Sequence, residues 1–507
     1  MIRGYAPAGA ETVTRMGSPL RPSMMLLLCL FLITPAFAAP NGEETANAPS
    51  PRPLSTRVPS PLVGPAALEV LSQDPRLEGA ELSASVIDLS TGSTLWSYQG
   101  DLPLHPASCT KLITTFAALE LLGPSYRFQT KLSVGSGRRP PLYWEARGDP
   151  KIVSEQLWLI ARRIRRAGIR EVGDLIFNTR AYGKERLAPG FEEKPGDQQA
   201  YRAASGALSV NFNRVAITVT PGKEGARPRV TLEPDGGYLR VKNQAKSRGR
   251  GRSRIRASLR RRRGKETLTI SGSIPRDHAP QVIYRRIDDP LRFSAAAIRE
   301  ALKGAGVRVR GKVREGRAPR GARRLFTHDS PPLGQLVADV NKFSNNFMAE
   351  QLLRAIGLER RGRGGWREGI SEVEGFLRER VGLRDFTYHN GSGLFGQTSF
   401  SAAHLVKLLR VAHQRSRSRP EFLSSLPLGG HDGTLAKRLS SLESGRVRAK
   451  TGTLNGVSAL CGYLSFADDR PGAFCFLMNG LTVKARAARA LQDEMLWALL
   501  RWRPAPR

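Results

Sequence analysis

The chain has 507 residues, of which 40% are hydrophobic and 24% are charged. These fractions are typical of a soluble globular protein and exclude both a membrane-embedded bundle and a wholly disordered chain, and the length allows about two to four domains. Lys and Arg (80) outnumber Asp and Glu (44), and the formal net charge of +36 predicts affinity for a polyanion or an anionic surface.

The N-terminal region has the pattern of an export signal. Arg15 and Arg21 precede an apolar stretch over residues 24–33, which Ala36-Phe37-Ala38 follows. We therefore expect a signal peptide over residues 1–38 and, after its cleavage, a protein of the periplasm or the cell wall. No later segment offers the roughly 18 uninterrupted apolar residues of a transmembrane helix. Residues 39–64, rich in Pro and Ser, are predicted to form a linker.

Residues 65–150 begin the folded part of the chain. Apolar and polar residues alternate over residues 82–98 around a Ser-Thr-Gly-Ser turn, which predicts a β-hairpin. Pro106 then opens a helix that carries apolar side chains on most of its circumference and ends at Gly123. A helix of this kind is expected in a core.

Residues 151–325 are predicted to form one or more inserted β-rich domains. Short strands separated by Gly and Pro are expected at residues 214–220, 229–232, 238–241 and 267–270.

A cationic run over residues 246–265 lies inside this region. It contains eleven Lys or Arg residues and no acid, and five arginines recur at the strand period of two: Arg248, Arg250, Arg252, Arg254 and Arg256. One face of an edge strand or loop is therefore expected to be cationic. Two interpretations remain open, a surface for an anionic wall polymer and a solvated loop that reflects only Arg-rich codon usage.

Residues 326–507 return to a helical pattern from Leu333. The chain then ends with two apolar strands, at residues 457–466 and 473–479, and a helix near residues 487–500.

The cysteines of this last part leave a choice. Cys461 and Cys475 flank a turn-like segment, so both a disulfide across a hairpin and two free buried thiols are consistent with the sequence. Neither the cysteines nor the histidines have metal-ligand spacing, so we expect no metal and no cofactor.

Three short motifs occur in order along the chain: Ser108-Cys109-Thr110-Lys111, Ser344-Asn345-Asn346 and Lys450-Thr451-Gly452-Thr453. Each is weak by itself, because a Ser-x-x-Lys is expected by chance about once or twice in a chain of this length. Ser108 could also be an ordinary helix N-cap. The three motifs in this order are far more specific.

The first motif has the chemistry of a nucleophile and its base. Ser108 and Lys111 lie three residues apart, on one face of the first helical turn, so their side chains can touch. Burial in an apolar helix favours the neutral, basic form of Lys, which can accept the serine proton. The helix N-terminus adds a positive field that favours the alkoxide.

The second motif is predicted to lie in a loop between two helices. The Ser344 hydroxyl can relay a proton between Lys111 and a leaving amine, and the Asn346 amide can bind a substrate peptide group. A structural helix cap is the alternative for this motif.

The third motif lies on a predicted edge strand. A substrate peptide can add there as a further strand while the Lys450 cation and the Thr451 hydroxyl hold its carboxylate. Gly452 permits close approach of the backbone.

Through these motifs the chain resembles the penicillin-binding proteins, and among them the class C low-molecular-mass D-alanyl-D-alanine carboxypeptidases and endopeptidases of the S13 peptidase family. The resemblance covers about residues 65–500 and includes Gly148-Asp149-Pro150, residues 207–213, Gly391-Ser392-Gly393-Leu394 and Gly433-Thr434-Leu435. It implies a hydrolase that acts on peptidoglycan stem peptides and is acylated by β-lactam antibiotics.

The resemblance also implies a role for each motif residue and a fold. Ser108 would be the acylated serine, Lys111 its base, Ser344 and Asn346 the second catalytic element, Lys450, Thr451 and Thr453 the carboxylate-binding strand, and the amides of Ser108 and Thr453 the oxyanion hole. The implied fold is an α/β (α+β) transpeptidase-like domain of the serine β-lactamase/DD-peptidase type. It has a five-stranded sheet flanked by helices and is interrupted by the inserted β-rich domains.

Two features depart from the family pattern. Asn390 and Phe395 stand where Asp and Ser are usual around the Gly-Ser-Gly-Leu segment, and the cationic run is unusual.

Two other functions are compatible with parts of the sequence. A serine β-lactamase shares the motifs but is normally compact and needs a water-activating group, and no such Glu can be assigned. A catalytically silent, cationic protein that binds wall or nucleic acid is disfavoured by the intact motifs. Nucleic acid is not an expected partner, because the chain has no helix-turn-helix, zinc-finger or RNP signal.

Overall fold

The computed structural model describes residues 62–262, 265–440 and 445–504. The predicted signal peptide and residues 39–61 of the predicted linker lie outside the described residues, as do Arg263 and Gly264 of the cationic run. Among the helices that the structure describes, none has the length and apolar character needed to cross a bilayer.

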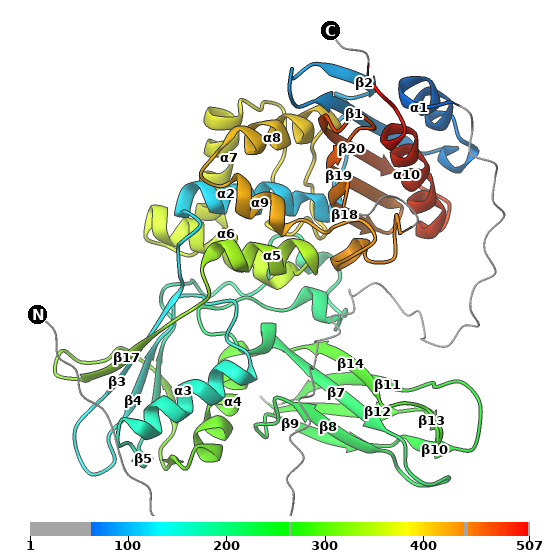
Figure 1. Cartoon of the computed structure of the whole chain (residues 1–507). Helices are drawn as coiled ribbons and strands as arrows, with labels where there is room; N and C mark the ends of the chain where they lie inside the picture. Colours follow the sequence, from blue (N-terminus) through cyan, green and yellow to red (C-terminus); the bar gives the residue numbers. More distant parts are fainter. Residues whose placement is uncertain (1–61, 263–264, 441–444, 505–507) are drawn as a thin grey trace, which may run out of the picture. The chain divides into compact units, whose positions relative to one another are not determined.

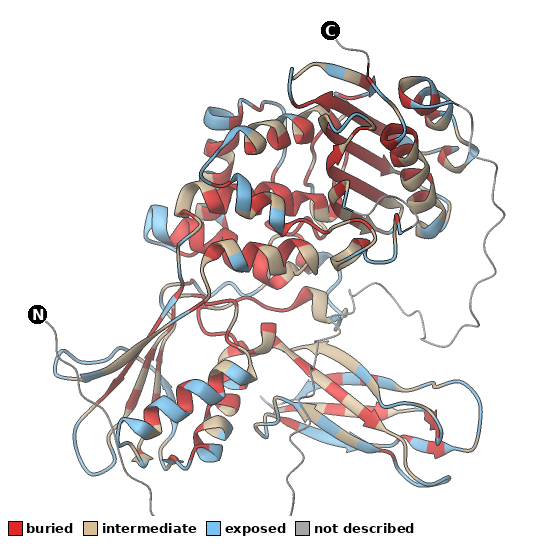
Figure 2. Ribbon diagram, in the orientation of Figure 1, coloured by how far each residue is buried: buried red, intermediate tan, exposed pale blue. Residues whose placement is uncertain are grey.

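The motifs are carried by a five-stranded antiparallel sheet in the order β18-β19-β20-β1-β2 (Figure 1). Its strands are β1 (Glu81–Asp88), β2 (Thr94–Tyr98), β18 (Val447–Leu454), β19 (Val457–Ser465) and β20 (Pro471–Asn479). The predicted hairpin is therefore confirmed as β1 and β2, and the two predicted C-terminal strands as β19 and β20. Figure 2 shows β1, β19 and β20 buried along most of their length, because helices cover both faces.

Helices α1 (Gly64–Ser72) and α10 (Ala485–Leu500) share one hydrophobic core with this sheet. Helix α8 (Ala402–Gln414) packs against β1, β19 and β20. The predicted terminal helix is confirmed as α10.

The predicted core helix is α2 (Thr110–Leu122), which is buried over residues 110–119 and ends at Gly123. It packs against four other helices, α5 (Leu333–Lys342), α6 (Asn346–Arg361), α7 (Trp366–Phe376) and α9 (Arg419–Ser425). Because helices surround α2, an apolar circumference is what its position requires.

A second five-stranded sheet, in the order β16-β6-β4-β3-β17, lies in the region between the first and second motifs. Its strands are β3 (Gln129–Val134), β4 (Leu142–Glu145), β6 (Leu175–Asn178), β16 (Val313–Glu315) and β17 (Arg323–Asp329), and β5 (Glu171–Val172) pairs nearby with β15 (Arg308–Val309). Residues 151 and 325 are the predicted limits of the insertion. Strands β3 and β4 precede residue 151 and β17 spans residue 325, so the sheet extends beyond both limits. Helices α3 (Ser154–Arg166) and α4 (Pro290–Gly304) share its core and were not expected from the sequence.

The remaining strands confirm the four predicted short strands. They form the sheet β14-β7-β8, the sheet β11-β12-β9 and the pair β10-β13. Their bounds are Arg214–Thr220 (β7), Arg229–Glu233 (β8), Leu239–Asn243 (β9), Lys246–Arg248 (β10), Arg256–Arg262 (β11), Lys265–Ser271 (β12), Ser273–Pro275 (β13) and Gln281–Arg286 (β14).

The cationic run occupies β10, a loop and the edge strand β11. Its five regularly spaced arginines, Arg248 to Arg256, are all exposed. On β11, Ala257 and Leu259 are buried while Arg260 and Arg262 are exposed. The expected cationic face is therefore present in the described part of the run.

Cys461 and Cys475 stand directly opposite each other on β19 and β20 and form a disulfide, with Cα atoms 4.0 Å apart. Of the two arrangements left open by the sequence, the structure has the disulfide. Cys109 is a buried free thiol.

Asp149, from the Gly-Asp-Pro segment, is a buried carboxyl at the base of the second sheet. Its Oδ1 accepts a hydrogen bond from Lys151 N at 2.8 Å, and its Oδ2 lies 3.8 Å from His328 Nε2. Burial, reinforced by the charge of Asp329, raises the pKa of Asp149 to about 7. Burial and Arg163 lower the pKa of His328.

We predict that Asp149 makes stability depend on pH. Because its pKa in the folded state lies above its unfolded value, the folded state binds the extra proton, and this contribution to stability is lost as the pH rises from about 4 to about 7. Asp149→Asn removes the titration, so the melting temperature of the variant relative to wild type should rise over that range. At pH 7 the contribution to the free energy of unfolding that wild type has lost is at most about 4 kcal/mol. Asp277→Asn, at an exposed carboxylate that does not act on Asp149, is the control, and equal pH dependence of Asp149→Asn and wild type would contradict the prediction.

Candidate active site

Ser108 lies in the short helix Ala107–Cys109, directly before α2. It is half-buried while its neighbours Ala107 and Cys109 are buried, so the hydroxyl stays accessible. Ala107 adopts a left-handed backbone with φ of 46°, an unfavourable conformation for a residue with a Cβ. The tight turn sets Ser108 at the N-terminal end of α2.

Two glycines from other motifs close around this turn. A Cβ at Gly452 would lie 2.6 Å from the carbonyl oxygen of Pro106, and a Cβ at Gly393 would lie 2.0 Å from that of Ala107. The close backbone approach expected at Gly452 is therefore present.

Lys111 is fully buried, and its Nζ has three polar neighbours. Nζ lies 2.9 Å from Ser108 Oγ, 2.6 Å from Asn346 Oδ1 and 2.8 Å from the carbonyl oxygen of Ser392. Burial lowers the pKa of Lys111 far below its ordinary value, and the charge of Lys450 lowers it further. A neutral amine has two N–H donors and one lone pair, which matches two acceptors and one hydroxyl donor. The geometry is that of a base ready to accept the Ser108 proton.

Lys450 is a second buried lysine with different partners. Its Nζ donates to Ser344 Oγ at 2.9 Å and to the carbonyl oxygen of Thr451 at 2.8 Å. Burial lowers its pKa to about 8. Lys450 therefore keeps its charge at neutral pH, whereas burial and the charge of Lys450 both favour the neutral form of Lys111.

Ser344 follows α5 in a left-handed conformation with φ of 53°, in the predicted loop between two helices. Its hydroxyl contacts Lys450, and the acceptors of Lys111 are Asn346 and Ser392. The expected link between Lys111 and Ser344 is therefore replaced in this structure by a link between Lys450 and Ser344.

Asn346 is the first residue of α6, after the N-cap Asn345. Its Oδ1 accepts from Lys111, and its Nδ2 donates to the carbonyl oxygen of Tyr201 at 3.1 Å. The amide that was expected to bind substrate is engaged by the inserted region instead. Through Asn346 this contact links that region to Lys111.

The third motif lies on β18, at the edge of the first sheet as predicted. Thr451 Oγ1 donates to Thr434 Oγ1 at 2.9 Å, and Arg489 donates to Thr453 Oγ1 at 3.4 Å. Residues 427–429 pair with residues 447–449 along the outer edge. Within the described ranges no strand pairs beyond them with the outer edge of Lys450–Thr453, so a peptide can add there.

Asn390 and Phe395, which depart from the family pattern, both contact the inserted region. Asn390 Oδ1 accepts from Gly393 N at 2.8 Å, while its Nδ2 donates to the carbonyl oxygen of Pro189 at 2.9 Å. A carboxylate could not make the second bond. The Phe395 ring lies 4.9 Å from Lys194 Nζ.

Sequence reasoning missed two groups that bear on the site, the carboxylate of Glu350 and the backbone carbonyl of Tyr201. Glu350 follows Asn346 by one helical turn on α6, and this spacing was the only signal for it in the sequence.

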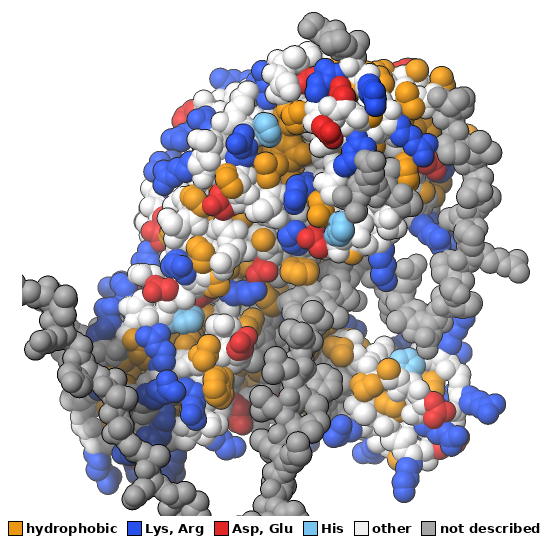
Figure 3. Space-filling view, viewed as in Figure 1, with side chains coloured by type: hydrophobic (Ala, Val, Ile, Leu, Met, Phe, Trp, Pro, Cys, Tyr) orange, Lys and Arg blue, Asp and Glu red, His pale blue; other side chains and the backbone are white. Residues whose placement is uncertain are grey.

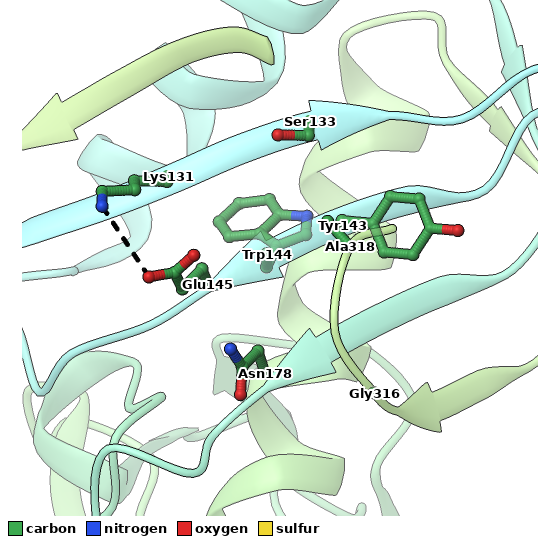
Figure 4. Close-up of a pocket in the computed structure, with 8 residues that line it drawn as sticks. All are labelled: Lys131, Ser133, Tyr143, Trp144, Glu145, Asn178, Gly316 and Ala318. Atoms are coloured by element: carbon green, nitrogen blue, oxygen red, sulfur yellow. Dashed lines mark ion pairs between the residues drawn. The ribbon is translucent and has the colours of Figure 1, made fainter. Parts of the chain in front are cut away.

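A small hollow of about 10 Å³ elsewhere in the chain is lined by strands of the second sheet (Figure 4). Lys131 and Glu145 form an ion pair across it at 3.8 Å. None of the motif residues lines this hollow. No group of three or more possible metal ligands is found among the described residues.

Known proteins share both the sequence and the fold. The sequence model of the D-Ala-D-Ala carboxypeptidase 3 (S13) family matches residues 65–500. The chain is similar to the D-alanyl-D-alanine carboxypeptidase of Actinomadura sp., with 35% identity over 84% of this chain and 82% of that protein.

Two solved structures are similar in fold. Penicillin binding protein 4 from Haemophilus influenzae has a TM-score of 0.73 and 22% identity, and the match covers 86% of this chain and 99% of that one. The same protein in complex with a β-lactam has a TM-score of 0.69 and 22% identity, with coverage of 85% and 98%. The predicted transpeptidase-like fold is confirmed.

The site geometry and the comparisons agree. With a family match over residues 65–500 and a relative 35% identical over most of its length, the chain belongs to the D-Ala-D-Ala carboxypeptidase 3 (S13) family and is a serine D-Ala-D-Ala carboxypeptidase.

Proposed function

We propose that the protein cleaves both the terminal D-Ala-D-Ala bond and the cross-links of peptidoglycan stem peptides. Both reactions pass through an acyl-enzyme on Ser108, and β-lactam antibiotics acylate the same serine. The observation that carries this proposal is the fully buried Lys111 Nζ, which lies 2.9 Å from the accessible Ser108 hydroxyl at a place where burial lowers the pKa of the lysine. The β-lactam complex of the Haemophilus influenzae protein supports the antibiotic reaction.

In the proposed acylation, Ser108 Oγ attacks the carbonyl carbon of the penultimate D-Ala while its proton moves to Lys111 Nζ. The backbone amides of Ser108 and Thr453 stabilise the oxyanion. Ser344 Oγ accepts an N–H from Lys450, so Ser344 gives its own proton to the leaving nitrogen as the C–N bond breaks and takes a proton from Lys450 in return. Water then hydrolyses the ester and releases the shortened peptide.

The two activities share one requirement. A terminal D-Ala carries a carboxylate on the carbon next to the scissile nitrogen. A cross-link to the D-centre of meso-diaminopimelate carries its carboxylate in the same place. The buried cation of Lys450 on the edge strand therefore suits both substrates.

Two further proposals concern where the enzyme acts. We propose that it acts after export, in the periplasm or at the cell wall, on the strength of the N-terminal sequence pattern. We also propose that the exposed arginines of the cationic run bind an anionic wall polymer. Figure 3 shows Lys and Arg side chains on the visible face of the region that contains β7 to β14, at the lower right.

The alternatives are less well supported by the site. A silent wall-binding protein would have no need for the three polar contacts of Lys111. A β-lactamase needs a group that activates water. The buried acid whose charge acts on Lys111 is Glu350, and its oxygens already accept hydrogen bonds from three N–H donors. That arrangement does not favour activation of water. Slow turnover of penicillin is expected, and rapid turnover would favour the β-lactamase.

The first prediction is that labelled penicillin acylates Ser108. Ser108→Ala should abolish both labelling and peptidase activity, and Lys111→Ala should be nearly as damaging because the serine loses its base. Cys109→Ser, at a buried neighbour, is the matched control and should be mild. Mass mapping of the labelled peptide is the measurement, and an adduct on any other residue would disprove the assignment.

The second prediction concerns the Lys450 cation. Lys450→Ala should lower cleavage of a D-Ala-D-Ala pentapeptide and of a purified cross-linked dimer together, by about tenfold to a hundredfold, because both lose a charge-assisted contact. In the wild type, kcat/KM should fall as the pH rises through about 8, where Lys450 loses its charge.

A pentapeptide with an amidated C-terminus is the control for this prediction. It should be cleaved slowly by the wild type, and Lys450→Ala should lower its cleavage by a smaller factor than that of the free acid. If the amide is cleaved as fast as the acid, or if the variant spares one of the two activities, the shared carboxylate contact is excluded.

The third prediction tests the cationic run. Replacing Arg250, Arg252 and Arg254 with Gln should weaken retention on isolated sacculi at low salt without changing hydrolysis of a small soluble peptide, since exposed charges act through screened attraction. Gln at Arg317, Arg320 and Arg324, which are also exposed, is the matched control. Unchanged retention of the first variant would remove the proposal.

A further inference from the structure

Glu350 is a buried acid on the helix that holds the catalytic base. It lies one turn after Asn346 on α6, and only 2% of the residue is exposed. Asn346 at the start of this helix accepts a hydrogen bond from Lys111. The positions i and i+4 project from the same side of a helix, so Glu350 and the contact to Lys111 lie on one face.

The Glu350 carboxylate is surrounded by N–H donors. Oε1 accepts from Ser392 N at 2.8 Å, and Oε2 accepts from Trp366 Nε1 at 2.8 Å and from Gly391 N at 3.2 Å. Burial raises the pKa of Glu350 above its ordinary value, although these bonds act in the opposite direction. Three donors and no acceptor match a carboxylate, since a carboxylic acid would present a proton to one of them.

The same segment joins Glu350 to the catalytic lysine. Glu350 fixes the amides of Gly391 and Ser392, and the carbonyl oxygen of Ser392 accepts from Lys111 Nζ at 2.8 Å. The carboxylate therefore helps to hold this turn, together with Asn390, whose Oδ1 accepts from Gly393 N in the same peptide group as that carbonyl. If this turn shifts, Lys111 loses one of the two acceptors that aim its lone pair at Ser108.

We infer that Glu350 is a positioning residue for Lys111 and the buried counter-charge of the lysinium that forms during acylation. This inference rests on the proposed roles of Ser108 and Lys111. When the O–H bond of Ser108 breaks, its proton forms a third N–H bond on Lys111 Nζ, and the lysine becomes a cation at a fully buried position. The anion of Glu350 interacts more strongly with that cation than with the neutral amine of the resting enzyme.

Such a contribution favours the transition state over the ground state, which is the condition for catalysis. A buried carboxylate behind a base serves the same purpose in the serine-histidine-aspartate triad, where it orients the base and stabilises its charged form. Here the orientation passes through a backbone carbonyl. Ser108, Lys111 and Glu350 thus act as a unit on two helices, α2 and α6.

The test is the pH dependence of the second-order rate constant for acylation by penicillin. Glu350→Gln keeps the volume and removes the charge. Its acylation rate should fall on the order of tenfold to a hundredfold at the plateau. Its acidic limb should also move to lower pH, because the anion of Glu350 raises the pKa of Lys111 and is lost. A purely structural defect would lower the rate without moving the limb.

Two variants serve as comparisons. Glu350→Asp retains the charge and should keep the acidic limb near its wild-type position even where the rate falls. Glu266→Gln changes another buried glutamate, which bonds to Tyr238 in the inserted region, and should leave acylation unchanged. Circular dichroism monitors folding, and if Glu350→Gln does not fold, the limb of Glu350→Asp decides the question.

The outcomes separate this inference from the proposed function. Failure of penicillin to label Ser108 in the wild type would disprove the proposed function itself. Normal labelling of the wild type with an unmoved limb in Glu350→Gln, or a shifted limb in Glu350→Asp, would overturn the role of Glu350 alone. Normal acylation with slowed deacylation would instead assign Glu350 to the activation of water.

Discussion

The burial of one amine, Lys111 Nζ, is the constraint on which the rest of the site depends. An ammonium ion in this position would lie in the apolar interior of a helical layer, so burial lowers the pKa of Lys111 and favours its neutral form. A neutral amine is a base, but it is useful only if its lone pair faces the nucleophile. Asn346 and Ser392 accept its two N–H bonds, which leaves the lone pair for Ser108.

Two buried lysines lie in this site, and their environments separate their roles. The charge of Lys450 lowers the pKa of Lys111, and burial lowers that of Lys450 itself to about 8. Lys450 has Ser344 and a carbonyl as acceptors and stays cationic near neutral pH. Groups with pKa values pushed apart in this way divide the work of base and cation between them.

Helix α6 ties the inserted region to the catalytic centre. Gln351 Nε2 donates to the carbonyl oxygens of Gly148 and Gly206 at 3.1 and 3.0 Å. Arg354 donates to Ser205 Oγ at 3.2 Å, and its guanidinium lies 4.1 Å from the centre of the Trp366 ring. Buried polar groups cost free energy unless they are paired, so these bonds specify one arrangement of the insertion against α6.

The sequence by itself determined the features that depend on neighbours along the chain. The spacing of Ser108 and Lys111 places both on one helical face, alternation predicts the β1–β2 hairpin, and Gly123 ends α2. Only the tertiary structure decided the partners of Ser344 and Asn346, the disulfide between Cys461 and Cys475, and the place of Glu350. Helix α3 was missed although its buried residues Leu157, Ile160, Ala161 and Ile164 recur at helical spacing. The physical reason is the distance along the chain. Periodicity and caps reflect contacts within a few residues. Lys111 contacts Asn346 and Ser392 across more than two hundred residues of chain, and such contacts form only when separate elements pack.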